Sequence, residues 1–171
     1  MNEPVTFSRI RFDDTSGALR DGDVRYVVMR ADGLMGAFAG SPTGLSALSR
    51  SVYEHGRLSV QKYQSELTHE IGDLLATIEG TAAELGWGVW RFAWSERVSL
   101  TLSVWSSPFA EVMVPASMPT CAPILGMFQA IAEAALGAGT RVVEAKCSAC
   151  GAPACEFVAK AADVTTLGRQ R

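Results

Sequence analysis

The chain has 171 residues, of which 48% are hydrophobic and 19% are charged, with 16 glycines and 7 prolines. This length and composition predict one globular domain and exclude a disordered or collagen-like chain. The net charge of −3 gives no basic field to hold phosphates, so nucleic-acid and membrane-surface binding are both disfavoured. The start, MNEPVTFSRIRFDD, lacks the features of a secretory signal, and no apolar run is long enough to span a bilayer. We therefore expect a cytoplasmic protein.

The beginning of the chain predicts an arm rather than a domain. Residues 1–23 mix short apolar pieces with the turn-rich DDTSGALRDGD and predict an arm with one strand. Residues 24–29 are β-branched and aromatic enough for another strand. Asp32 is placed to cap a short helix that runs to Phe38.

Two longer helices are expected next. Apolar residues recur at helical spacing from residue 45 to residue 60, with Gly56 as the internal interruption, so a helix bent at this glycine is expected. The segment 67–85 has an apolar stripe with acidic residues elsewhere, and Gly86 follows it as a stop. This pattern predicts an amphipathic helix.

After Gly86 the apolar period becomes alternating, which predicts a β-hairpin. Its first strand carries Trp90, Phe92 and Trp94 on one face, and its second carries Val98, Leu100, Leu102 and Val104. A two-residue turn would pair Trp94 with Ser99. A three-residue turn over 95–97 would pair Trp94 with Val98 and gather both apolar sets on one face. We favour the three-residue turn.

The second half of the chain predicts a loop, a helix and two strands. Residues 106–119 contain three prolines and predict a loop. Thr120 can cap the following helix, which ends before Gly137. TRVVEAK and ACEFVA then predict two strands around the turn SACGAP, and residues 161–171 predict a frayed tail. The expected fold class is α+β, with a mostly antiparallel sheet packed against several helices.

Three of the four cysteines, Cys147, Cys150 and Cys155, fall within nine residues. In a reducing cytoplasm this spacing favours metal binding over disulfides. Cys121 begins a predicted helix, where the free amides favour the thiolate that binds metal. Zinc takes about four ligands in a tetrahedron, and a turn between two strands can supply two of them. For any single cysteine the alternative is a small buried hydrophobe.

Residues 121–160, CAPILGMFQAIAEAALGAGTRVVEAKCSACGAPACEFVAK, resemble the signature of the 4-vinyl reductase domain family. The pattern is a Cys that opens a helix, Glu-x-x-Cys, a small-residue turn and Cys-x-Phe. A weaker resemblance extends upstream through YVVMRADGLMGAF and SPFAE, so a single domain over 24–160 is expected. This hydrocarbon-binding domain is also the sensor of bacterial regulators that bind phenols, and it is distantly similar to TRAPP transport-particle subunits with acyl-binding tunnels.

The resemblance implies a zinc ion held by three cysteines and a glutamate. These ligands map onto Cys121, Glu144, Cys147 and Cys155. Cys150 is an extra thiol in the turn and is the alternative fourth ligand. Glu144 and Cys147 are an odd number of residues apart, so they face opposite ways unless the strand bulges or ends between them. Four protein ligands leave no open position, so the zinc is expected to be structural.

The aromatic residues of the middle of the chain form a candidate ligand pocket. They are Trp87, Trp90, Phe92, Trp94, Trp105 and Phe109. Either they line a pocket for a flat apolar ligand or they form the core between sheet and helices. Arg57 and Arg91 are candidate anchors for a ligand carboxylate. His55 and His69 lie on polar stretches of predicted helices and are expected to be solvated rather than catalytic.

The resemblance implies a binding module that forms a homodimer, as related domains do. Such a carrier or sensor would hold a hydrophobic aromatic or tetrapyrrole ligand and act through a partner enzyme or regulator. The alternative is an enzyme, or an accessory protein, for reduction of a tetrapyrrole vinyl group in bacteriochlorophyll biosynthesis. GxGxxG and P-loop patterns are absent from the sequence, so neither a nicotinamide nor a nucleotide site is argued, and no catalytic set is assigned.

Overall fold

The fold is seen in a computed structural model that describes residues 10–66, 70–96 and 98–161. Its elements, in chain order, are β1 (Arg11–Asp13), β2 (Ala18–Asp21), β3 (Val24–Tyr26), α1 (Ala31–Gly36), α2 (Pro42–Glu66), α3 (Ile71–Glu84), β4 (Val89–Ser95), β5 (Ser99–Trp105), α4 (Pro108–Glu111), α5 (Ala122–Leu136), β6 (Arg141–Lys146), the short 3-10 turn η1 (Ser148–Cys150) and β7 (Cys155–Lys160). Within these residues the strands form two antiparallel sheets, which confirms the expected α+β class.

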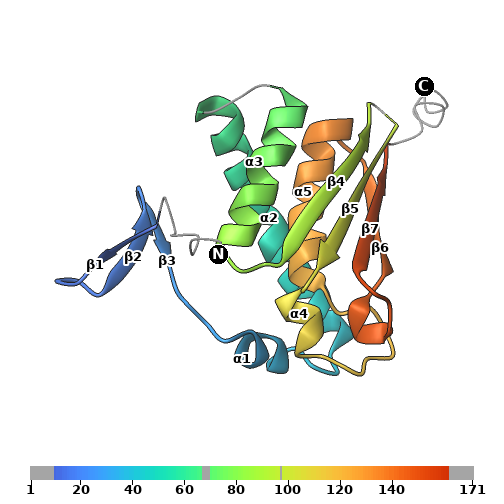
Figure 1. Ribbon diagram of the computed structural model, residues 1–171, viewed down its shortest axis with the longest axis horizontal. Coiled ribbons are helices and arrows are strands. Elements are labelled where there is room, and N and C mark those ends of the chain that lie inside the picture. The colour runs from blue at the N-terminus through green and yellow to red at the C-terminus, as the bar shows by residue number, and fades with distance from the viewer. Residues whose placement is uncertain (1–9, 67–69, 97, 162–171) are drawn as a thin grey trace, which may run out of the picture.

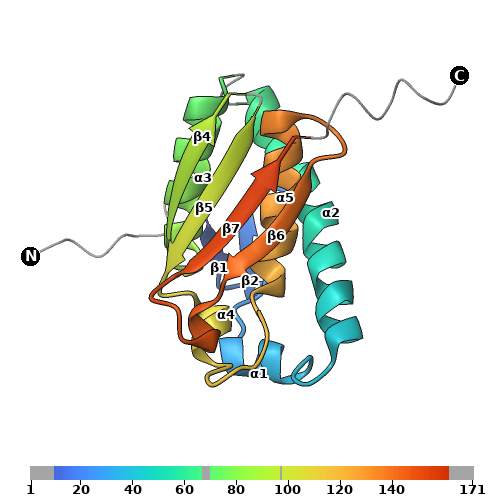
Figure 2. The same cartoon turned by 90° about the vertical axis from the view of Figure 1, so that its right-hand side faces the viewer.

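The larger sheet has the strand order β4-β5-β7-β6 and carries the core on one face. Figure 2 shows this sheet from its open side, with α3 and α5 behind it and α2 packed against α5. Alternate residues of each strand point toward the helices because side chains alternate across a strand. The inward side chains of Trp90, Leu102 and Phe157 are therefore fully buried, against Phe128 of α5 among others.

Close approach of α2 and α5 depends on a glycine. A Cβ atom at Gly126 would collide with the backbone carbonyl of Ser49, so only glycine fits where the two helices touch. Gly56, where the sequence predicts a bend, lies inside the single helix α2 and faces Met127 of α5. This tight contact fixes α2 beside the sheet-bound α5.

The β4–β5 hairpin has the expected turn length in a different register. Ser95 pairs with Ser99 and Trp94 pairs with Leu100, so the prediction that Trp94 pairs with Val98 is wrong. The Val98 amide donates to the Ser95 carbonyl at 3.0 Å, which closes the turn one residue later than predicted. Because this register differs from the predicted one by an even number of residues, both apolar sets still share one face.

The segment predicted as a loop, residues 106–119, contains the short helix α4. Ser107 caps it, since its Oγ accepts a hydrogen bond from the Ala110 amide at 3.3 Å, and Pro108 fits its first turn. Phe109 of α4 is thereby turned into the core, with 5% of its surface exposed.

Two predicted helix caps are wrong. Asp32 lies inside the first turn of α1, whose N-cap is Arg30. Thr120 precedes the N-cap of α5, which is Cys121, and the Thr120 Oγ1 lies 3.8 Å from the Cys147 sulfur. Neither N-cap residue satisfies a helix amide with its side chain, so these two helices are stabilised by packing more than by capping.

The N-terminal arm holds more strands than the sequence predicts. The part of residues 1–23 that the structure describes contains β1 and β2 rather than one strand, and β3 ends at Tyr26 instead of continuing to residue 29. Gly17 and Gly22, with φ of 61° and 58°, make the two turns of this meander. Figure 1 shows the meander beside the main body, joined to α1 by an extended segment. The predicted tail, except Ala161, lies outside the described residues.

Among the described residues, no helix combines the length and apolar character needed to cross a membrane.

Candidate functional site

Four side chains from three places in the sequence meet at one end of the sheet. Cys121 is the N-cap of α5, Glu144 lies on β6, Cys147 precedes η1, and Cys155 begins β7. Their ligand atoms all lie within 4.8 Å of one another. The three cysteines are buried and Glu144 is half-buried.

A β-bulge brings Glu144 and Cys147 to the same side. Glu144 pairs with Phe157, but Lys146 pairs with the adjacent residue Glu156, so β6 contains one extra residue between these pairs. A bulge of this kind shifts the alternation of side chains. The condition drawn from the odd spacing of Glu144 and Cys147 is therefore met.

Hydrogen bonds hold this Cys/Glu cluster in place. The Cys121 amide donates to Glu144 Oε2 at 3.1 Å, and the sulfurs of Cys121 and Cys155 lie 3.4 Å apart. The Ser148 amide donates to the Cys155 sulfur at 3.3 Å, and Ser107 Oγ lies 3.4 Å from the Cys121 sulfur. Glu144 Oε1 is the one buried side-chain oxygen or nitrogen of the described residues without a hydrogen-bond partner. That oxygen is available to a ligand.

The four groups cannot all carry charge without a cation. Burial raises the pKa of Glu144 to about 8, and hydrogen bonds from Cys147 and Cys155 raise the pKa of Cys121. Hydrogen bonds from Cys121 and Cys155 lower the pKa of Cys147, which makes it the preferred thiolate. A divalent cation at the centre would stabilise all four anions. Three sulfurs and one carboxylate oxygen at these spacings therefore fit a tetrahedral metal ion.

Cys150 stands apart from this group. Its side chain is exposed and is not among the four residues whose ligand atoms converge. The structure thus places Glu144, rather than the alternative Cys150, beside the three buried thiols.

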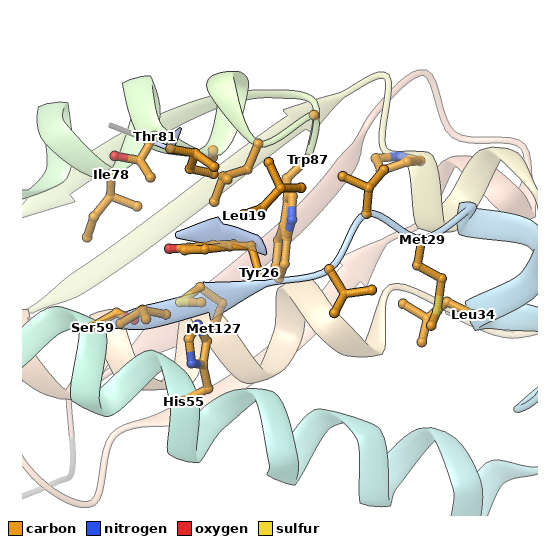
Figure 3. Close-up of a pocket in the computed structure, with 18 of the residues that line it drawn as sticks. Leu19, Tyr26, Met29, Leu34, His55, Ser59, Ile78, Thr81, Trp87 and Met127 are labelled. Atoms are coloured by element: carbon orange, nitrogen blue, oxygen red, sulfur yellow. The ribbon is translucent and has the colours of Figure 1, made fainter. Parts of the chain in front are cut away.

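A cavity of about 710 Å³ lies between the N-terminal meander and the main body. Its lining residues are Ile10, Phe12, Leu19, Val24, Arg25, Tyr26, Val27, Val28, Met29, Ala31, Leu34, His55, Ser59, Val60, Tyr63, Ile78, Thr81, Ala82, Leu85, Gly86, Trp87, Trp90, Pro108, Phe109 and Met127. Figure 3 shows His55 and Ser59 of α2 facing Ile78 and Thr81 of α3 across this space.

One end of the cavity is aromatic. Trp87 and Phe109 meet edge to face, with ring centroids 5.1 Å apart, and Trp87 also contacts Trp90. The Trp90 Nε1 donates to the Trp87 carbonyl at 3.1 Å, so its polar atom is satisfied while its ring stays buried. This end offers flat apolar surfaces with fixed orientation.

The predicted pocket residues divide between the cavity and other places. Trp90, Phe109 and Trp87 line the cavity, whereas Phe92 stacks on Phe128 in the core. Trp94 and Trp105 are 39% and 44% exposed and do not line it.

The predicted polar residues are also placed elsewhere, with one exception. Arg57 pairs with Glu54 at 3.5 Å, and Arg91 pairs with Glu79 at 3.4 Å, so neither arginine lines the cavity. His55 is exposed but faces the cavity, while His69 lies outside the described residues.

The cavity wall contributed by the meander was missed by the sequence reasoning. Phe12 pairs with Leu19 and Leu19 pairs with Tyr26, so these side chains form one apolar row across the three strands. All three line the cavity. The apolar residue between two charged ones in RFD is the pattern that could have indicated this face.

Comparisons with known proteins agree with this architecture. The phenol-responsive sensory domain of the transcription activator PoxR, solved with phenol, is 18% identical, with a TM-score of 0.73 over 90% of this chain and 85% of that one. A vinyl-4-reductase family protein from Methanocaldococcus jannaschii is 16% identical, with a TM-score of 0.54 over 83% of this chain and 86% of that one. A trafficking protein particle complex subunit 3 from Naegleria fowleri, covalently bound to palmitic acid, is 12% identical, with a TM-score of 0.49 over 78% and 95%.

No curated protein matches the sequence. The family model of the vinyl-4-reductase domain matches residues 100–161, a segment that runs from β5 through α5 to the end of β7 and contains all four residues of the Cys/Glu cluster. The resemblance to the 4-vinyl reductase domain family is therefore confirmed, and residues 100–161 of this chain are a match to that domain.

Proposed function

We propose that the chain is a sensor or carrier domain that binds a hydrophobic aromatic molecule in the cavity beneath the meander. The observation that carries this proposal is the mostly aliphatic cavity of about 710 Å³ with Trp87, Trp90 and Phe109 at one end. Ligand pockets usually measure about 300–1,000 Å³ and are lined in this way. The match to the vinyl-4-reductase domain and the likeness to a phenol-responsive sensory domain support the proposal.

The lining favours a neutral aromatic ligand over a tetrapyrrole with carboxylates. A buried carboxylate needs a cationic partner. Among the described lining residues, Arg25 is the only Lys or Arg, and its side chain is exposed on the meander. The polar groups that do reach the cavity include His55, Ser59 and Thr81, which suit one hydroxyl or similar group on the ligand.

The Cys/Glu cluster is proposed to hold one structural zinc ion. Cys121, Glu144, Cys147 and Cys155 supply four ligands, so no position is left for water or substrate. Such an ion would join the start of α5 to the β6–β7 hairpin. Its role is to stabilise the fold that supports the cavity rather than to do chemistry.

The binding proposal predicts that neutral aromatic probes stabilise the folded chain. Phenol, and separately protoporphyrin IX, are added to the full chain and the melting temperature is measured. Phenol at 100 times its Kd should stabilise the protein by about 2.7 kcal/mol, because it binds only the folded state. Ser59→Trp, which fills the cavity from α2, should abolish the shift, whereas Ser51→Trp on the exposed part of the same helix should not.

Absence of a shift with both probes contradicts the proposal. A shift with protoporphyrin IX alone identifies the tetrapyrrole as the ligand class. Turnover of a divinyl tetrapyrrole with NADPH by the purified protein alone would instead support the enzyme.

We also propose that the chain forms a homodimer in which the segment after β3 is covered. Val27, Val28 and Met29 are 77%, 82% and 62% exposed, although all three are apolar and adjacent. Sedimentation equilibrium should give a dimer for the wild type and a monomer for Val28→Lys. The same change at Val98, which is 63% exposed in the hairpin turn, should leave the dimer intact. A monomeric wild type contradicts this proposal.

A further inference from the structure

The turn beside the Cys/Glu cluster has the sequence Cys147-Ser148-Ala149-Cys150, which is a Cys-x-x-Cys motif. The Cys150 amide donates to the Cys147 carbonyl at 3.0 Å, and this bond closes the 3-10 turn η1. A hydrogen-bonded turn of four residues brings its end Cα atoms within about 7 Å. Disulfides join cysteines whose Cα atoms are about 4.4–6.8 Å apart, so the backbone is already near the spacing that a Cys147–Cys150 disulfide needs.

The two cysteines of the motif differ sharply in access to solvent. Cys147 is 3% exposed and belongs to the Cys/Glu cluster, whereas Cys150 is exposed and outside it. Gly151, in the left-handed conformation at φ 95°, ends the turn directly after Cys150. A soluble oxidant can therefore reach one thiol of the pair while the other lies in the cluster.

We propose that the Cys147–Cys150 turn is an oxidation site at which a peroxide forms a disulfide. One thiol reduces the peroxide, becomes a sulfenic acid and releases one water. The second thiol then attacks that sulfur, the S–S bond forms, the S–O bond breaks and a second water leaves. The two sulfurs give up two electrons, and both thiol protons end in water.

The disulfide takes Cys147 away from the Cys/Glu cluster. Cys121, Glu144 and Cys155 are then left as three ligands, so a bound metal ion loses its closed tetrahedron. This consequence rests on the proposed zinc site, whereas the disulfide itself does not. Oxidation of an exposed thiol thereby controls metal retention in the buried cluster.

The test treats the full chain, as purified, with hydrogen peroxide. Digestion and mass spectrometry should find a Cys147–Cys150 crosslink in the wild type. A chromogenic chelator should detect metal release about tenfold faster from the wild type than from Cys150→Ser, which lacks the second thiol. Equal melting temperatures of the two proteins before oxidation show that the variant is folded, as expected for an exposed position.

Lack of the crosslink in oxidised wild-type protein overturns the proposal, as does a crosslink that joins other cysteines. Equal rates of metal release from the wild type and Cys150→Ser overturn the link to the metal. A Cys147–Cys150 crosslink in protein that holds no metal as purified supports the oxidation site while refuting the proposed zinc. The two failures are therefore distinguishable.

Discussion

Cys121→Ser is expected to release the metal ion and to lower the free energy of unfolding by several kcal/mol. The Cys121 sulfur is fully buried at the start of α5 and lies 3.4 Å from the Cys155 sulfur. Metal binding to such a site is coupled to folding, and loss of a metal ion is among the few changes that cost more than about 4 kcal/mol. Metal content measured by mass spectrometry and unfolding in urea test both effects.

Two further variants identify the fourth ligand. Glu144→Ala should lose the metal, because the Glu144 carboxylate converges with the three sulfurs, whereas Cys150→Ser should keep it. The reverse result would make Cys150 the ligand. Wild-type protein that is metal-free as purified, and that melts at the same temperature with and without added zinc, would sink the zinc proposal.

Trp90→Ala is expected to lower the free energy of unfolding by about 3–5 kcal/mol, the usual cost of truncating a buried aromatic side chain. Trp90 is 1% exposed and packs between Trp87 and Phe92. The same variant should weaken phenol binding when measured well below its own melting temperature, since Trp90 lines the cavity. Denaturant unfolding gives the first effect and equilibrium dialysis gives the second.

Trp105→Ala is the matched control. Trp105 is 44% exposed and lies outside the cavity lining, so its loss should cost much less stability and leave phenol binding unchanged. If the two tryptophan variants lose equal stability and equal affinity, the assignment of Trp90 to core and cavity is wrong.

The C-terminal part of the fold was predictable because its patterns are local. The apolar stripe of α5 and the strands of the β6–β7 hairpin lie where periodicity places them. Residue spacing within the family signature also brought together Cys121, Glu144, Cys147 and Cys155. Even the bulge in β6 was foreseeable, as the condition that lets Glu144 and Cys147 share one side.

The cavity was less predictable because its walls come from distant segments. Alternation shows which strand residues share a face, but it does not show how far along the sheet the helices extend. Trp94 shares the face of Trp90 and is nevertheless 39% exposed, at the end of β4. Trp105 follows the inward-facing Val104 and so points to the opposite face, which the period itself implied.

The hairpin and the meander show the same limit on shorter ranges. The turn after Trp94 depends on which residue pairs with Ser99, and alternation alone is satisfied by more than one register. The row of Phe12, Leu19 and Tyr26 forms only when three short strands pair, so no single segment reveals it.

Equilibrium dialysis of phenol against the full chain tests the central claim most directly. The account predicts saturable binding of one phenol per chain in the wild type and in Ser51→Trp, with binding lost in Ser59→Trp because the indole occupies the cavity. Binding of phenol by all three proteins alike, or by none of them, would contradict the claim that this cavity holds a neutral aromatic ligand.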